Sequence, residues 1–220
     1  MFNVLSVDDL SQDFLISLWD EAYDRKGKRN KKLNGKILTN LFYEPSTRTS
    51  SSFYSAMKLS GGDVIPINNV TFSSVSKGES LEDTVKTISQ MCDLIVLRHN
   101  IAGSAKIASQ VSGVPIINAG DGNSEHPTQT ILDGYTIYHY FNKKIDNLNI
   151  TLVGDLKNGR TVKSLVKLLT RFKNNKFNFV SPENLRFDGQ LPPNSSEVSD
   201  INKVIEETDI LYVTRVQKER

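Results

Sequence analysis

Residues 36–60 read KILTNLFYEPSTRTSSSFYSAMKLS, and this stretch already indicates how the chain is built. The run at 36–43 is rich in β-branched and aromatic residues, which favour a strand. The pattern at 47–60 is that of a helix. A strand that passes directly into a helix is the repeating element of α/β proteins. We therefore expect a parallel sheet with helices packed against it.

The same alternation continues along the chain on both sides of this stretch. Further β-rich runs lie at 63–67, 93–98, 114–118, 148–153, 177–180 and 209–214. Helical patterns lie at 6–23, 80–92, 103–112, 126–141 and 161–172. This order predicts an α/β fold with two small doubly wound domains, each built on a parallel sheet. Such sheets bind ligands beyond the carboxyl ends of their strands, and that is where site residues are expected.

A polar stretch at 142–149 (NKKIDNLN) marks the expected domain boundary. It follows a long predicted helix and precedes a new strand, so we expect domains at 1–142 and 143–220. The length of 220 residues suits two small domains or one large one, at roughly 100–200 residues each. Residues 182–200 contain three of the seven prolines and are expected to form a surface connection.

Composition and charge exclude several classes of protein. With 27 Lys and Arg against 25 Asp and Glu, the formal net charge is +2, which gives no broad field for nucleic acid or a membrane surface. The basic run at 25–32 lacks interleaved aromatic residues and is interpreted as a solvated loop. Cys92 is the only cysteine, which excludes a disulfide framework. No signal-peptide pattern or membrane span is recognised, so we expect a cytoplasmic protein.

Arginine is unevenly placed along the chain. Lysine outnumbers it 18 to 9, yet four of the nine arginines closely follow predicted strands. These four are Arg48, Arg98, Arg160 and Arg215. A planar guanidinium binds carboxylate or phosphate through two hydrogen bonds, which an ammonium group does not do. Any one of them alone is better explained as an ion-pair residue, but four at equivalent positions predict a cleft for ligands with several negative charges.

The corner at 43–50 (YEPSTRTS) is the clearest candidate site. It follows the first strand and opens a helix, whose free N–H groups and dipole favour a phosphate. Four donor side chains follow one another here, namely Ser46, Thr47, Arg48 and Thr49. A single serine or threonine would be explained as an N-cap, but four donors exceed what a cap needs.

Two further segments carry residues suited to an anion. The block at 126–129 (HPTQ) begins a predicted helix, and a histidine there is discouraged from gaining charge, so His126 is placed to donate as a neutral imidazole. The polar loop at 71–80 is either an ordinary surface loop or a lid that brings Lys77 to an anion.

Several other chemistries are not supported. The loop at 154–161 (GDLKNGRT) nearly matches a nucleotide phosphate loop, but Arg160 stands where that motif has lysine. No G-x-G-x-x-G follows a strand, so a dinucleotide cofactor is not expected. Neither metal-ligand spacing nor a Ser/His/Asp triad is recognised. We therefore predict a reaction with no cofactor and no metal.

Taken together, these segments resemble the aspartate/ornithine carbamoyltransferase family. The corner at 42–49 (FYEPSTRT) is similar to its carbamoyl phosphate signature. Similarity to the aspartate branch, and not to the ornithine branch, lies at 155–162 (DLKNGRTV) and 212–220 (YVTRVQKER). Arg98, 126–129 and 77–79 (KGE) also fit. The resemblance implies transfer of a carbamoyl group from carbamoyl phosphate to L-aspartate, in pyrimidine biosynthesis.

The resemblance also implies a role for each matched residue. The phosphate would be bound by Ser46, Thr47, Arg48 and Thr49. The carbamoyl oxygen would be polarised by Thr49, Arg98 and His126, and the carbamoyl amide would contact Gln129. The carboxylates of aspartate would be bound by Lys77, Arg160, Arg215 and Gln217. Ser73 and Lys77 would reach the active site of a neighbouring subunit in a homotrimer, and a regulatory chain is a further partner that the resemblance allows.

The sequence departs from the family pattern at a few places. Lys163, Asn158 and Ser76 replace residues common in the family, none of them an assigned ligand. The chain stops at Arg220, before a loop and a returning helix that family chains carry, so the second domain is expected to be incomplete. Two alternatives remain: a carbamoyltransferase for another amine, which Arg215 and Gln217 argue against, and a non-catalytic anion-binding or scaffold fragment.

Overall fold

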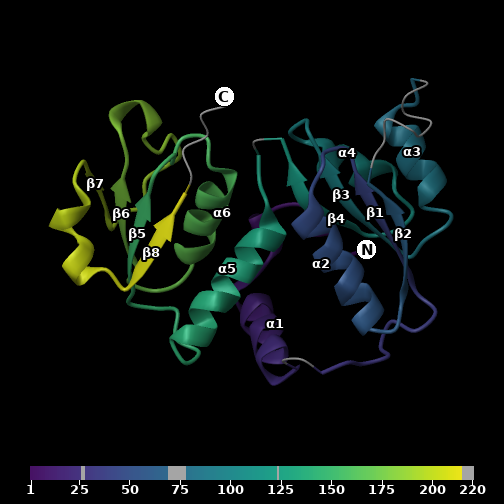
Figure 1. Ribbon diagram of the computed structural model, residues 1–220, viewed down its shortest axis with the longest axis horizontal. Coiled ribbons are helices and arrows are strands. Elements are labelled where there is room, and N and C mark those ends of the chain that lie inside the picture. Colours follow the sequence, from purple (N-terminus) through teal and green to yellow (C-terminus); the bar gives the residue numbers. More distant parts are fainter. Residues whose placement is uncertain (26–27, 69–77, 123, 215–220) are drawn as a thin grey trace. The chain divides into compact units, whose positions relative to one another are not determined.

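The computed structural model describes residues 1–25, 28–68, 78–122 and 124–214. By its internal contacts the chain divides into two compact units, Met1–Thr128 and Gln129–Arg220. Each unit contains its own four-stranded parallel sheet (Figure 1). The expected α/β architecture with two parallel sheets is therefore confirmed. The division of the chain into two substrate-binding domains after residue 142 stays a prediction.

The first unit alternates strands and helices. It begins with η1 (Val7–Asp9) and α1 (Gln12–Arg25). Four strands and three helices then follow in turn: β1 (Ile37–Phe42), α2 (Thr47–Leu59), β2 (Asp63–Ile67), α3 (Leu81–Ile88), β3 (Leu94–His99), α4 (Ser104–Val111) and β4 (Ile116–Asp121). The strand order is β2-β1-β3-β4, and every pair is parallel.

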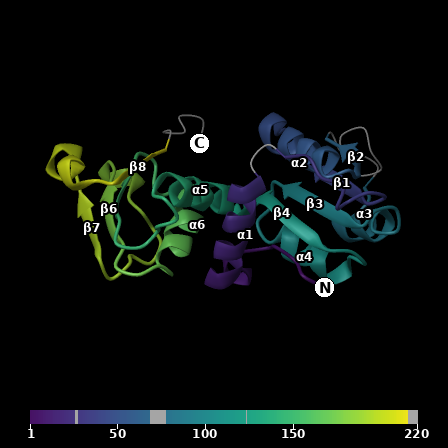
Figure 2. The same cartoon turned by 90° about the horizontal axis from the view of Figure 1, so that it is seen from below.

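Alternate side chains of the central strands explain why this sheet is covered on both faces. Leu41, Ile95 and Leu97 pack with α3 and α4, whereas Phe42 and Val96 pack with α2. Successive residues of a strand point to opposite faces, so each strand contributes to both clusters. Figure 2 shows α2 and α4 on opposite sides of this sheet.

The second unit also contains a parallel sheet, and its strands are four or five residues long. The helix α5 (Pro127–Tyr140) contains the division between the units. It is followed by β5 (Asn149–Val153), α6 (Arg160–Leu169), β6 (Lys176–Val180), η4 (Glu183–Leu185), β7 (Ser195–Val198), η5 (Ile201–Lys203), η6 (Ile205–Glu207) and β8 (Ile210–Val213). The order is β7-β6-β5-β8, again parallel throughout. Its core includes the stacked rings of Phe179 and Phe187, whose centroids are 4.8 Å apart.

Both sheets reverse their winding direction once, and this locates the sites. From β1 the chain passes outward to β2 and then crosses to β3 on the other side of β1. From β5 it passes outward to β6 and β7 and then crosses to β8 on the other side of β5. Ligands of doubly wound sheets bind at such a switch point, beyond the carboxyl ends of the two strands. The corners after β1 and β3, and after β5 and β8, are therefore the places to examine.

Two expectations from the sequence are corrected. The single helix expected at 6–23 is two elements, because Ser6 and Asp9 form a capping box around η1 and the Ser11 hydroxyl accepts from the Phe14 N–H to begin α1. The connection expected at 182–200 contains the edge strand β7, whose register pairs Phe177 with Ser195.

Candidate functional site

The helix α2 begins directly beyond the carboxyl end of β1, and its first turn carries the predicted phosphate ligands. Ser46 occupies the N-cap position, but its side chain makes no capping hydrogen bond. The first turn contains Thr47, Arg48 and Thr49 and no acidic residue. The hydroxyl of Ser46 is thus not used to cap the helix, so the simple N-cap explanation does not account for it. A helix N-terminus with these donors suits an anion.

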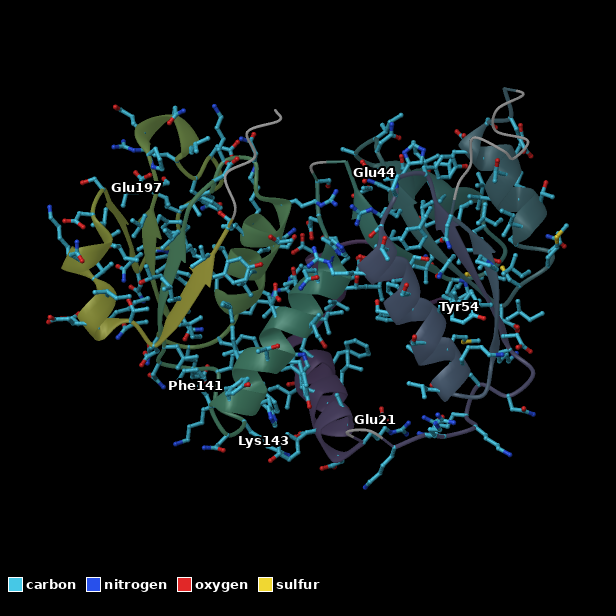
Figure 3. The ribbon with its side chains drawn as sticks, viewed as in Figure 1. Glu21, Glu44, Tyr54, Phe141, Lys143 and Glu197 are labelled. Atoms are coloured by element: carbon cyan, nitrogen blue, oxygen red, sulfur yellow. The ribbon has the colours of Figure 1, made fainter. Side chains whose placement is uncertain are left out.

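Arg98 lies near the end of β3 and contacts residues on both sides of that strand. Its Nε is 3.3 Å from Oε2 of Glu44, which follows β1 (Figure 3). Its Nη1 donates to the carbonyl of Ala119 in β4 at 3.3 Å. Nε is buried and has no hydrogen-bond partner among the described residues. Its contact with Glu44 is therefore an ion pair and not a hydrogen bond. At 14% side-chain exposure, this guanidinium is a preorganised cation at the switch point.

His99 and Asp121 shape the corners after β3 and β4. The Nδ1 of His99 accepts from the Ile101 N–H at 3.0 Å, which requires a lone pair on Nδ1 and places the ring proton of the neutral imidazole on Nε2. Burial lowers the pKa of His99, and the nearby carboxylates of Asp121 and Glu44 oppose this only in part. Asp121 accepts from the Gly103 N–H at 2.9 Å. Both side chains thus hold the loop after β3 in place.

His126 precedes α5 and is almost fully buried, with 6% of its surface exposed. Its Nδ1 is 3.4 Å from the hydroxyl oxygen of Thr128. The neighbouring Glu125 accepts from the Ser6 hydroxyl at 2.9 Å and from the Val7 N–H at 2.8 Å. These two bonds attach the start of α5 to η1 at the other end of the unit's sequence, and they fix the backbone that carries His126.

In the second unit, the loop between β5 and α6 is built around Asp155. This carboxylate is 2% exposed and accepts from the Asn158 N–H at 2.9 Å. Thr214, just after β8, donates to the Val153 carbonyl at 3.1 Å. Gly154 has φ +114°, and a Cβ there would lie 2.3 Å from the Thr214 carbonyl oxygen. The loop that starts at Gly154 then continues to Arg160, the first residue of α6.

Gln129, Asp133 and Tyr212 form a hydrogen-bonded chain within the second unit. Gln129 Nε2 donates to Oδ1 of Asp133 at 2.9 Å, and the Tyr212 hydroxyl donates to Oδ2 at 3.1 Å. Burial raises the pKa of Asp133, while the two donors act against it. Burial and the Asp133 charge raise the pKa of Tyr212 to about 12. Tyr212 therefore remains a hydrogen-bond donor at neutral pH.

The structure thus brings Arg98 and the start of α2 to one switch point and Arg160 to the other. Four predicted site residues lie outside the described residues, namely Ser73, Lys77, Arg215 and Gln217. Reasoning from the sequence missed the contacts of Glu44, Asp133 and Tyr212. Only Asp133 had a local signal, since it lies one helical turn after Gln129.

The described part of the chain contains neither a cluster of metal-binding side chains nor a helix suited to span a membrane. No group of three or more His, Cys, Asp or Glu side chains there is arranged to hold a metal ion. None of the described helices is long and apolar enough to cross a membrane. What the two corners offer is guanidinium groups, hydroxyls and helix N-termini, which bind anions and polarise carbonyl oxygens.

Comparison with known proteins gives a consistent result. A family model described as aspartate/ornithine carbamoyltransferase, carbamoyl-P binding domain, matches residues 3–139. The aspartate carbamoyltransferase catalytic subunit of Methanococcus vannielii is 48% identical over 233 aligned positions, covering 100% of this chain and 76% of the relative.

Solved structures of high similarity carry related names. The catalytic subunit of Methanocaldococcus jannaschii aspartate transcarbamoylase matches with a TM-score of 0.91 at 45% identity, over 100% of this chain and 76% of that one. Aspartate transcarbamoylase from Trypanosoma cruzi, in complex with carbamoyl phosphate and aspartate, matches with a TM-score of 0.89 at 37% identity, over 98% of this chain and 76% of that one.

Proposed function

Because this chain belongs to the aspartate/ornithine carbamoyltransferase family, we propose that it is an aspartate carbamoyltransferase. It transfers the carbamoyl group of carbamoyl phosphate to the amine of L-aspartate, giving N-carbamoyl-L-aspartate and phosphate. The observation that carries this proposal is the corner after β1, where a helix N-terminus rich in hydroxyls is joined to the Arg98 guanidinium through Glu44. Those donors suit a ligand with a charged phosphate and a carbonyl oxygen.

The phosphate and the carbamoyl group are bound by different donors. The phosphate is bound at the start of α2 by Ser46, Thr47, Arg48 and Thr49. The carbamoyl oxygen accepts from Thr49, Arg98 and His126, and the carbamoyl amide donates to Gln129. This division supports the mechanism, because the donors to the oxygen act on the atom where negative charge develops.

L-aspartate is bound through its two carboxylates. Arg160 at the start of α6 is one ligand, and its position beyond β5 at a switch point supports this assignment. Arg215, Gln217 and Lys77 complete the set. Guanidinium groups favour an acceptor with two carboxylates and repel the cationic side chain of an amine such as ornithine.

The reaction itself needs positioning and electrostatic stabilisation. The aspartate nitrogen forms a bond to the carbamoyl carbon, and the carbonyl oxygen becomes an oxyanion held by its donors. The C–O bond to the phosphate then breaks, and the surplus proton of the amine leaves with the phosphate. Holding the two substrates together supplies about 7–11 kcal/mol of the barrier. Each oxyanion donor contributes about 2.7–4 kcal/mol.

The family resemblance also supports a wider biological setting. The chain acts in the cytoplasm, in pyrimidine biosynthesis, as a homotrimer whose active sites are shared between subunits. Ser73 and Lys77 enter the site of the neighbouring subunit, and a regulatory chain is a further partner. Mixing two inactive variants, Lys77→Ala and His126→Ala, tests the shared site. Activity restored by mixing supports it, and inactive mixtures that still form trimers contradict it.

The direct test of the activity is to incubate the protein with carbamoyl phosphate and L-aspartate and to measure carbamoyl aspartate. Formation of this product supports the proposal. Product from ornithine but not from aspartate would favour a transferase for another amine. Phosphate binding without turnover would favour an anion-binding fragment.

The phosphate site has a test of its own. Arg48→Ala removes the guanidinium from the first turn of α2, and we expect calorimetry to detect no binding of inorganic phosphate at concentrations that saturate the wild type. Arg25→Ala changes a half-buried arginine of α1 that pairs with Glu21; it is the control and keeps full affinity. Equal affinity in Arg48→Ala and the wild type would contradict the assignment.

A further inference from the structure

Glu125 joins the two ends of the first unit's sequence. It lies between β4, which ends at Asp121, and α5, which begins at Pro127. Its Oε1 accepts from the Ser6 hydroxyl at 2.9 Å, and its Oε2 accepts from the Val7 N–H at 2.8 Å. The two donors are 119 and 118 positions away in the sequence. Two charge-assisted bonds to one carboxylate fix its orientation, whereas a single bond would let it turn.

The segment before η1 is itself held against the sheet. The Val4 N–H donates to the Ile116 carbonyl at 3.0 Å, and the Val4 carbonyl accepts from the Asn118 N–H at 2.8 Å. The side chain of Asn118 donates to the Leu5 carbonyl at 2.9 Å. These bonds to β4 restrict the segment, so η1 is a fixed attachment point for Glu125.

His126 follows Glu125 directly in the chain. Its side chain is buried, and its Nδ1 lies 3.4 Å from the hydroxyl oxygen of Thr128. Because neighbouring Cα atoms are about 3.8 Å apart across a trans peptide bond, a shift of the Glu125 backbone is passed on to His126. The position of the imidazole therefore depends on the bonds that Glu125 makes to η1.

We propose that Glu125 is a positioning residue for His126, which attaches the start of α5 to η1 and so holds the imidazole where it donates to the carbamoyl oxygen. This inference rests on the proposed function, in which His126 is one of the donors to that oxygen. A donor stabilises an oxyanion only within hydrogen-bond distance of the developing charge. The N-terminal segment, which supplies none of the proposed ligands, thereby contributes to turnover.

The kinetic test removes the carboxylate. Glu125→Ala should lower kcat about tenfold, because a misplacement of about 1 Å at a reacting group costs up to about 100-fold. The KM for carbamoyl phosphate and the affinity for inorganic phosphate should stay within about threefold, because the proposed phosphate ligands lie at the start of α2. Added to His126→Ala, the same change should lower kcat no further, because Glu125 acts through His126.

Variants on both sides of the contact grade the effect. Glu125→Gln keeps an acceptor for the Val7 N–H, so it should lose less kcat than Glu125→Ala. Ser6→Ala removes one of the two bonds and should lower kcat in the same direction. Ser6→Thr keeps the hydroxyl and should restore kcat, which a general loss of stability in this segment would not explain.

A matched control lies at the opposite end of the same sheet. Asp93, which precedes β3, also accepts from one side chain and one backbone N–H, those of Lys36 at 2.7 Å and Ile37 at 2.9 Å. This carboxylate lies at the amino ends of β1 and β3, whereas the proposed site lies beyond their carboxyl ends. Asp93→Ala should lower Tm but keep kcat within about twofold of the wild type.

A spectroscopic readout follows the ring itself, without any substrate. The chain has three histidines, so the NMR signals of their ring nitrogens are assigned by replacing each in turn. Ser6→Ala should shift the signals of His126 and leave those of His99 and His139 unchanged. Since Ser6→Ala keeps the charge of Glu125, a shift reports movement of the ring and not a changed electric field. Asp93→Ala should leave all three unchanged.

The failure of this inference and that of the proposed function are distinguishable. An unchanged kcat in Glu125→Ala, or a loss that adds to that of His126→Ala, would overturn the inference. Unchanged His126 signals in Ser6→Ala would overturn it as well. If the wild type forms no carbamoyl aspartate, the proposed function fails, and the NMR comparison still decides whether Glu125 sets the position of His126. If Glu125→Ala does not fold, Ser6→Ala and Ser6→Thr provide the kinetic comparison.

Discussion

Replacing Arg98 with lysine keeps the positive charge at the end of β3 but removes the planar fork. The guanidinium reaches Glu44 Oε2 through Nε and the Ala119 carbonyl through Nη1, both at 3.3 Å. A lysine has one terminal nitrogen on a flexible stem and satisfies one of these positions at a time. The lost contact costs about 1 kcal/mol of folding stability, since the pair is only partly buried. The free energy of unfolding should therefore change little.

The effect on turnover is expected to be much larger. Losing one donor to the developing oxyanion costs about 2.7–4 kcal/mol, which lowers kcat about 100- to 1,000-fold. The assay measures kcat and KM for carbamoyl phosphate, phosphate affinity by calorimetry, and Tm. Phosphate affinity should stay within about threefold, because the proposed phosphate ligands lie at the start of α2 and not on β3. Arg25→Lys makes the same change at a half-buried residue of α1 that pairs with Glu21, and it is the matched control. A kcat for Arg98→Lys within about threefold of the wild type would refute the reasoning.

Three other changes give separate outcomes. His126→Ala should lower kcat by more than it weakens carbamoyl phosphate binding, because its proposed role is in the transition state. Steady-state kinetics with calorimetry measure both quantities, and equal losses would contradict this role. Gly154→Ala should destabilise the protein by about 2 kcal/mol or more in urea unfolding, because its φ of +114° and the 2.3 Å approach of the new Cβ to the Thr214 carbonyl both oppose a side chain. Gly113→Ala, whose Cβ would make only ordinary contacts of 3.6 Å or more, should change stability little. For His99, burial lowers the folded-state pKa below the unfolded value of about 6.5, so the unfolded state binds the proton first and stability should fall as pH drops below about 6.5. Urea unfolding at several pH values checks this, and an equally steep fall in His99→Asn would assign it to other groups.

Much of the fold was predictable because the buried strands are short apolar runs between helical patterns. The run at 36–43 contains β1 (Ile37–Phe42), and the pattern at 161–172 overlaps α6 (Arg160–Leu169). The strand β7 (Ser195–Val198) was not predictable, because its sequence is SSEV and it lies at the sheet edge. An edge strand pairs mainly through backbone groups, which any sequence supplies, so hydrophobic periodicity gives no signal there.

Features of the candidate site that depend on adjacent residues were predictable, and contacts between residues far apart in the sequence were not. The start of α2 and the start of α6 were predictable from donors and glycines that are adjacent in sequence. The pairing of Glu44 with Arg98 joins different strands, and the contact of Asp133 with Tyr212 spans 79 residues. Such contacts depend on which strands become neighbours in the sheet. The strand order is a property of the whole fold and not of any segment.

Both sheets have a switch point beside the strand that comes first in their sequence, β1 or β5. In each sheet, the first strand in sequence has one neighbour that the chain forms before it reverses direction and one that it forms afterwards. The neighbours of β1 are β2 and β3, and the neighbours of β5 are β6 and β8. The corner after this first strand opens a helix. A residue near the end of the return strand contacts that corner: Arg98 pairs with Glu44 in the first unit, and Thr214 donates to the Val153 carbonyl in the second. At both corners a guanidinium group and a helix N-terminus supply positive charge, Arg98 and α2 in the first unit and Arg160 and α6 in the second. The proposed reaction joins two small anions, and the two corners are the proposed binding places of one anion each.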